Sequence, residues 1–125
     1  MQLFTNPFST KKNFESITDY WSPKIIGELN GQYIKIAKLK GDFVWHKHEN
    51  EDEMFFIIKG KLTIELKELT IHLKEGEGYI VPKNTMHNPT CNEECWVMLI
   101  EPKETLHTGN VQTDKSKPIE DQLVM

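Results

Sequence analysis

The sequence contains no arginine. All fifteen of its basic side chains are lysine, set against nineteen acidic ones, and the formal net charge is -4. A chain with this balance has no basic footprint of the kind that holds a phosphate backbone. It also has no guanidinium group to bind phosphate or carboxylate through two parallel hydrogen bonds. We therefore expect no nucleic-acid partner.

Long hydrophobic runs and a cysteine framework are missing as well. No stretch approaches the roughly 18 apolar residues that a membrane span needs, and residues 1–7 do not combine a charged start with an apolar run. The two cysteines, Cys91 and Cys95, form neither a CxxC pair nor a disulfide framework. We expect a cytoplasmic protein with two reduced thiols and no membrane partner.

The length of 125 residues and the 38% of hydrophobic residues suit one domain with one core. We expect an N-terminal capping segment over 1–31, a barrel over 32–101 and a tail over 102–125 that packs on the surface or is partly disordered. Within the cap, residues 13–21 predict a short helix that stops near Ser22-Pro23, because the residue before proline avoids helical angles.

Alternation of apolar and polar residues begins after the cap. It places Tyr33, Lys35, Ala37 and Leu39 on one face of a first strand that Gly41 ends. Further strands are expected over 42–48, 53–58, 61–66, 69–73, 79–81 and 96–101, with a hairpin joined through Lys67-Glu68. Many short strands with little helical periodicity predict an all-β sandwich or barrel of antiparallel strands.

Histidine occupies positions in this pattern where a core residue belongs. His46 and His48 are two apart, so on a strand they face the same side as Val44. Burying imidazole rings without partners costs about 1 to 3 kcal/mol each, and a shared metal ion removes that cost. Glu53 opens the next strand on its inward face, and His87 follows a proline-anchored turn. Three imidazoles and one carboxylate suit a divalent transition metal with coordination positions left for water or substrate.

These residues resemble the two short motifs of the cupin superfamily. The first motif is a glycine, His-x-His, a glutamate and a closing glycine, here Gly41, His46, His48, Glu53 and Gly60, with one residue fewer than usual between Gly41 and His46. The second is here Gly76, Pro82, Asn84, His87 and Cys91, with Asn84 in place of a glycine and Cys91 in place of an asparagine.

The resemblance implies a small single-domain cupin, which is a jelly-roll barrel or double-stranded β-helix. It also implies one divalent transition metal on His46, His48, Glu53 and His87: Fe, Mn, Ni, Co, Cu or Zn. His46, His48 and Glu53 rest on strand geometry and motif together, whereas His87 rests more on the resemblance. If one of the four is labile, we expect it to be His87.

Three functions fit such a site. The first is a metal-dependent isomerase or lyase on a small sugar-like or keto-acid substrate, with the metal as Lewis acid. The second is an Fe(II) dioxygenase. The third is a non-catalytic barrel that binds a small ligand or a metal. The catalytic residues are left unassigned, and Tyr33, Tyr79 and Met98 are candidate pocket liners.

The remaining aromatic and histidine residues receive structural roles. His72 and His107 lie outside both motifs and are expected to be exposed. Four hydrophobic residues are expected on the face opposite the ligands, where they pack a core or a partner subunit: Phe43, Trp45, Phe56 and Ile58. Because small jelly rolls leave edge strands and two-fold pairing is common, a homodimer is expected.

Overall fold

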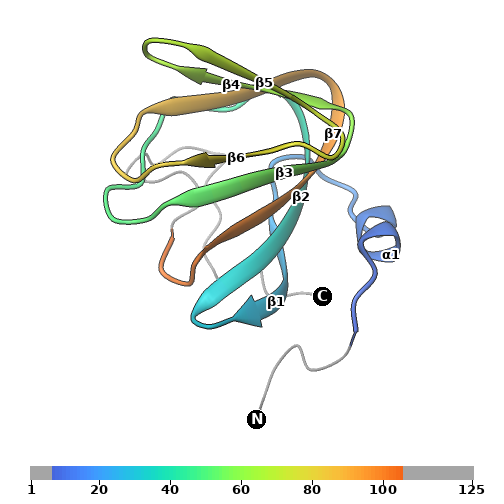
Figure 1. Ribbon diagram of the computed structural model, residues 1–125. Coiled ribbons are helices and arrows are strands. Elements are labelled where there is room, and N and C mark those ends of the chain that lie inside the picture. Colours follow the sequence, from blue (N-terminus) through green and yellow to red (C-terminus); the bar gives the residue numbers. More distant parts are fainter. Residues whose placement is uncertain (1–6, 106–125) are drawn as a thin grey trace.

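The computed structural model describes residues 7–105, and these form an antiparallel β-barrel with one short helix, as expected for an all-β chain (Figure 1). The expectations for His107 and for most of the tail lie outside the described residues. The elements are α1 (Thr10–Glu15), β1 (Lys24–Leu29), β2 (Gln32–Asp42), β3 (Glu53–Lys59), β4 (Lys61–Leu66), β5 (Thr70–Lys74), β6 (Gly78–Val81) and β7 (His87–Pro102).

Strand β7 organises the barrel because it changes partners along its length. It spans sixteen residues: residues 90–102 pair with β2 on one side, while on the other side residues 87–90 pair with β4 and residues 96–100 pair with β3. The order β1-β2-β7-β3-β6 follows, with β5 attached through β4 (Figure 1). The sequence predicted only the second half of β7, over 96–101.

The structure differs from the expected pattern at Gly41. This glycine has φ +84 and lies at a register shift inside β2, which continues to Asp42 instead of ending. Residues 43–52 then contain one isolated bridge, His46 to His87, and no regular strand. The expected strand over 42–48 is therefore wrong, because the chain leaves the sheet one residue after the bulge.

The N-terminal part is also built differently in detail. The helix spans Thr10–Glu15 and not 13–21, because the Ser9 hydroxyl accepts a hydrogen bond from the Lys12 N–H and caps an earlier start. Residues 24–29 form β1 and pair with β2, although no strand was predicted there. The domain boundary at residue 32 stays a prediction.

The β4–β5 hairpin is confirmed, with Ile64 opposite Ile71 and Leu62 opposite Leu73 on the buried face. Lys67 and Glu68 lie at the tip of the hairpin, as expected, and strand β5 begins at Thr70 instead of residue 69. Glu65 pairs with Thr70, and the Leu66 N–H donates to the Leu69 carbonyl at 2.9 Å. Leu69 belongs to this turn and is exposed.

Two hydrophobic clusters lie on opposite faces of β2, β3 and β7. The inner cluster fills the barrel with the odd-numbered residues of these strands, among them Ala37, Leu39, Phe55, Ile57, Val97 and Leu99. The outer cluster lies between these strands and the N-terminal segment, with Phe14, Ile17, Ile26 and Ile36 at its centre. The helix lies against this outer side (Figure 1).

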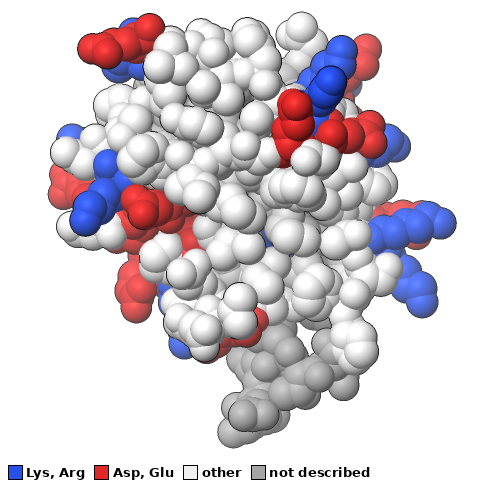
Figure 2. Space-filling model, viewed as in Figure 1, with Lys and Arg blue, Asp and Glu red and all other residues white. Residues whose placement is uncertain are grey.

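The surface carries no single dominant charge on the side that Figure 2 shows. Lysine and acidic side chains alternate around the rim, and uncharged side chains occupy most of the middle. Among the described residues, no helix has the length and apolar character to cross a lipid bilayer.

Candidate metal centre

The four residues expected to hold a metal come together inside the barrel. One ligand atom from each of His46, His48, Glu53 and His87 lies within 4.8 Å of the others. All four side chains are buried, between 0 and 5% exposed. The four arise from three separate places in the chain: the segment after β2, the start of β3 and the start of β7.

Two backbone hydrogen bonds hold His46 and His87 opposite each other. The His46 N–H donates to the His87 carbonyl at 3.0 Å, and the His87 N–H donates to the His46 carbonyl at 2.9 Å. The Nδ1 atom of His46 lies 2.8 Å from the Val44 carbonyl, and Nδ1 of His87 lies 2.9 Å from the Thr85 carbonyl. A carbonyl can only accept, so Nδ1 carries the proton in both rings and Nε2 keeps its lone pair for a metal.

Several polar atoms of the cluster have no hydrogen-bond partner among the described residues, which is the property that fits a metal. Nε2 of His48, Nε2 of His87 and Oε1 of Glu53 are buried without a hydrogen-bond partner, although Oε1 lies 3.3 and 3.6 Å from the two nitrogens. Ligands bonded at about 2.0–2.2 Å lie at most about 4.4 Å apart, so shifts of a few tenths of an ångström would suit one ion. The donor set suits a divalent transition metal.

The turn before His87 explains one departure from the second motif. Asn84 stands where cupins usually have glycine, and it adopts φ +59. Asparagine enters this left-handed region more readily than other residues with a side chain. The Asn84 N–H donates to the His48 carbonyl and so ties the turn to the segment that carries the other histidines.

Cys91, the other departure, is a core residue. It pairs with Gly41 across β2 and β7 and is buried, as is Cys95. Burial raises the pKa of Cys91 to about 11 and that of Cys95 to about 12. Both are free thiols outside the ligand cluster, and thiols with raised pKa values are poor metal ligands and nucleophiles.

The electrostatics of the cluster favour the protonation states that bind metal. Burial lowers the pKa of His46 to about 4, helped by the neighbouring His87, so the ring is neutral at neutral pH. Burial alone would raise the pKa of Glu53, but interactions with His48 and His87 outweigh it and hold the pKa well below its usual range. A neutral imidazole and a carboxylate are the forms that ligate.

A small cavity of about 30 Å³ adjoins the cluster. His46 and Glu53 line it together with apolar side chains that include Trp21, Phe43 and Phe55. It has room for about two water molecules. A larger, solvent-exposed hollow of about 490 Å³ lies along α1, away from the cluster. Its lining includes Lys12, Asp19 and Lys24.

Phe43 is on the ligand side of the barrel, so the expectation that it lies on the opposite face is wrong. Its ring stacks on Trp21 at 4.6 Å and meets His46 edge-on at 5.4 Å. The alternation of a strand does not apply here because the chain has left β2 at Asp42. Trp21, expected at a helix end, also lines the cavity, and its indole N–H donates to the Lys40 carbonyl at 2.8 Å.

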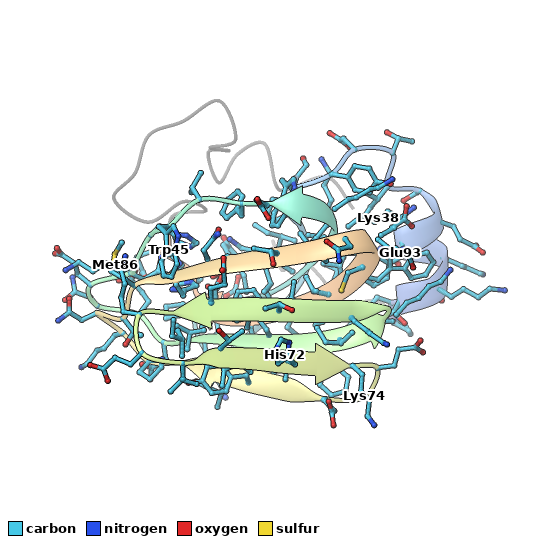
Figure 3. The ribbon with its side chains drawn as sticks, turned by 90° about the horizontal axis from the view of Figure 1, so that it is seen from above. Lys38, Trp45, His72, Lys74, Met86 and Glu93 are labelled. Atoms are coloured by element: carbon cyan, nitrogen blue, oxygen red, sulfur yellow. The ribbon has the colours of Figure 1, made fainter. Side chains whose placement is uncertain are left out.

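Other expected positions have mixed outcomes. His72 is exposed on β5, as expected, and its Nδ1 lies near the Thr63 hydroxyl. Met98 packs in the outer cluster and not in the pocket, because the inward residues of β7 are the odd-numbered ones. Figure 3 shows Trp45 and Met86, each next to a ligand histidine in sequence, at one end of the molecule, with Lys38 and Glu93 at the other.

Sequence reasoning missed a buried ion pair close to the cluster. Lys35 Nζ lies 2.8 Å from Glu101 Oε1, and the side chains are 0 and 3% exposed. The only signal in the sequence was position: Lys35 shares a face with Ala37 and Leu39, and Glu101 continues the inward series of Val97 and Leu99.

Known proteins share this architecture. The family model described as Cupin domain matches residues 33–103. The structure of a cupin-2 domain containing protein from Shewanella frigidimarina is similar at 39% identity, with a TM-score of 0.75, over 76% of this chain and 93% of that one.

Two curated relatives match as well, each over part of its length. The uncharacterized protein YdbB of Bacillus subtilis is 35% identical over 50% of this chain and 56% of that protein. The 3-hydroxyanthranilate 3,4-dioxygenase of Xenopus laevis is 27% identical over 65% of this chain and 31% of that protein. The chain thus spans about half of the first and about a third of the second. The matched family model covers most of the barrel strands and all four clustered residues, and this chain belongs to the cupin family.

Proposed function

We propose that this cupin is a metal-dependent enzyme that isomerises or cleaves a small sugar-like or keto-acid substrate. The observation that carries the proposal is the set of buried, unpartnered donor atoms on His48, Glu53 and His87 beside the oriented ring of His46. Buried polar atoms without partners are costly, and a divalent ion of Fe, Mn, Ni, Co, Cu or Zn satisfies all of them together.

The charge of the site favours an anionic substrate oxygen. Three neutral imidazoles and the Glu53 carboxylate leave one positive charge on a divalent ion, and the surroundings are largely apolar. The metal supplies Lewis acidity toward a carboxylate, carbonyl or hydroxyl oxygen. His46 and His87, with Nδ1 bound to carbonyls, hold their rings in one tautomer and orientation. This charge makes a keto-acid a better candidate than a neutral sugar.

The cavity limits the substrate by size. About 30 Å³ beside His46 and Glu53 accepts the coordinating head of a molecule and little more, so the body of a larger substrate would have to displace Trp21 or Phe43. Apart from these two ligands, none of the residues that line the cavity in the described range 7–105 carries an acid or base, so the reaction we propose depends on groups at the metal.

Oxygenase chemistry is a second candidate, favoured by the similarity to 3-hydroxyanthranilate 3,4-dioxygenase. With Fe(II) in the site, positions not taken by His46, His48, Glu53 and His87 would remain for a substrate and dioxygen. A third candidate is a non-catalytic barrel that holds a metal or small ligand. It is favoured because the described part of the chain places no further acid or base in the cavity.

Metal analysis of the purified protein tests the metal centre. We expect about one transition-metal ion per chain in the parent and almost none in a His46→Ala, His48→Ala double variant, because both rings supply ligands. His72→Ala is the matched control, since His72 is exposed and outside the cluster. Equal metal content in the parent and the double variant would refute the proposal.

Turnover separates the three candidates once the native metal is restored. Sugar phosphates, keto-acids and oxygen-consumption assays with aromatic substrates are compared in the parent and the double variant. Product formation without oxygen uptake supports the isomerase or lyase, and oxygen uptake supports the dioxygenase. Ligand binding without turnover in every assay supports the non-catalytic barrel.

We also propose a homodimer in the cytoplasm. Edge strands β1 and β6 carry the exposed side chains Leu29 and Ile80, which a second copy would cover. The free, buried thiols of Cys91 and Cys95 are compatible with a reducing compartment. Sedimentation equilibrium checks the dimer: a mass of one chain at micromolar concentration contradicts it.

A further inference from the structure

Three formally charged side chains are buried in the described part of the chain, and they form one row. Among residues 7–105, the buried lysine, aspartate and glutamate residues are Lys35, Glu53 and Glu101. They lie on β2, β3 and β7, which are adjacent strands. Glu53 is a member of the ligand cluster, whereas Lys35 and Glu101 are not among its four ligands.

The register of the strands places the three side chains side by side. Met54 pairs with Ile100, so Glu53 and Glu101 occupy the next facing positions of β3 and β7. Lys35 pairs with Leu99, two residues from Glu101, and is therefore its diagonal neighbour on the same inner face. The row runs in the order Lys35, Glu101, Glu53, followed by the imidazoles of His48 and His87.

The contacts along the row are close. Lys35 Nζ lies 2.8 Å from Oε1 of Glu101, while Oε2 of Glu101 has no hydrogen-bond partner. Because positions 53 and 101 face each other on β3 and β7 and both side chains are buried, the two carboxyl groups lie side by side on the inner face. Facing carboxylates on neighbouring strands repel unless cations flank them. Lys35 supplies a cation on the Glu101 side, and a metal on Glu53 would supply the other.

We propose that Glu101 and Lys35 are positioning residues for the metal centre: Glu101 orients the Glu53 carboxylate toward the ion, and Lys35 holds Glu101 in place. The inference rests on the proposed metal site and extends it to the neighbouring strands. Groups that contact metal ligands fix their orientation, and their replacement typically weakens metal affinity 10- to 100-fold. The row also explains why a lysine is tolerated at an inner position of β2, between the positions of Tyr33 and Ala37.

The experiment measures Co²⁺ binding by competition with a chromophoric chelator, together with the visible absorption of bound Co²⁺. Lys35 and a bound ion would favour the charged form of Glu101, and Glu101→Gln keeps the shape of the side chain but cannot carry that charge, so Lys35 is left as an unpaired cation near the ion. We expect this variant to bind Co²⁺ 10- to 100-fold more weakly than the parent, with a changed absorption spectrum because Glu53 is no longer held in one orientation.

A second variant keeps the inference testable if Glu101→Gln does not fold. In Lys35→Met, Glu101→Met the whole pair is replaced by apolar side chains, a change that buried ion pairs often tolerate. We expect this variant to fold and to bind Co²⁺ at least tenfold more weakly than the parent. The matched control is the exposed pair of Lys103 and Glu28, at 3.4 Å, where Glu28→Gln and Lys103→Met, Glu28→Met should bind like the parent.

The outcomes separate this inference from the metal centre itself. If the parent binds Co²⁺ and every folded Glu101 variant binds within twofold of it with the same spectrum, the positioning role is wrong and the metal centre stands. If the parent binds no Co²⁺, or binds it equally after the His46→Ala, His48→Ala change, both the metal centre and the positioning role fall.

Discussion

The two faces of strands β2, β3 and β7 differ in what they bury. The outer face buries an apolar cluster: Phe14 of α1 stacks on Trp96 of β7 at 4.8 Å, with isoleucines around the pair. The inner face mixes an apolar cluster with His87, two glutamates and a lysine, and the segment after β2 adds His46 and His48 to it. The same three strands thus carry a face whose packing stabilises the fold and a face that holds unpartnered polar atoms.

This difference indicates that the outer face stabilises the fold and the inner face binds the proposed metal. Burial of apolar surface in the outer cluster stabilises the barrel without polar requirements. Polar atoms such as Nε2 of His48 and His87 on the inner face are unfavourable in the metal-free protein and become favourable when an ion binds. Changes to the outer face should therefore lower stability and leave metal binding intact, and changes to the inner ligands should abolish metal binding.

The largest effect expected on the outer face comes from Phe14→Ala. Phe14 is fully buried, and its loss removes the stacking on Trp96 and leaves a void against β2. We expect the free energy of unfolding to fall by about 3–5 kcal/mol, as measured by urea denaturation, with one metal ion still bound per chain. Phe8→Ala, at a side chain that is 47% exposed, should change stability by less than about 0.5 kcal/mol. If the folded Phe14→Ala protein lost its metal, the outer face would also affect metal binding, and the separate roles of the two faces would be wrong.

The inner face should give the metal-free protein a distinct acid sensitivity. Burial lowers the pKa of His46 from 6.5 to about 4. The unfolded chain therefore takes up a proton at this residue below about pH 6.5 while the folded chain does not. Stability from His46 is complete above pH 6.5 and falls as the pH drops toward 4, by about 3 kcal/mol at most.

The comparison with His46→Ala isolates this effect. Burial and the neighbouring Glu53 raise the pKa of Glu101, which contributes a change of opposite sign, but that group is present in both proteins. Urea unfolding at several pH values between 4 and 7.5, with chelator present, should show the parent losing more stability than the variant. Parallel pH profiles would show that His46 is not the source.

Much of this arrangement was predictable because it depends on local pattern. Apolar runs, alternation and turn residues predict β3, β4, β5 and β6 to within a residue at each end. His46 and His48 were singled out on a strand over 42–48 that the structure lacks, yet their side chains are buried as expected. The residues that were missed depend on other information. Lys35 and Glu101 are neighbours only through the register of β2 and β7, and charged residues in an alternating strand are more often exposed.

Phe43 and Trp21 were missed for a different reason. Both lie where the backbone leaves regular structure, so neither helical nor strand periodicity predicts their direction. Trp21 has φ +57, in the region that favours glycine, and it lies between a helix and a strand. Its contact with Phe43, and through Phe43 with His46, is long-range in sequence and follows from the closure of the barrel.

Trp21 also marks the point where the chain passes from the outer face to the inner one, since Ile17 belongs to the outer cluster and Trp21 to the inner. Trp21→Ala and Trp21→Gly remove the same packing, but alanine keeps the strain of the positive φ and glycine relieves it. We expect the glycine variant to be the more stable by about 1 kcal/mol in urea unfolding. At Tyr20, which is not among the residues with positive φ, alanine should be more stable than glycine. If the alanine variant had the larger free energy of unfolding at both positions, the backbone at Trp21 would be unstrained. Side-chain packing against the two faces alone would then set the path of the chain between them.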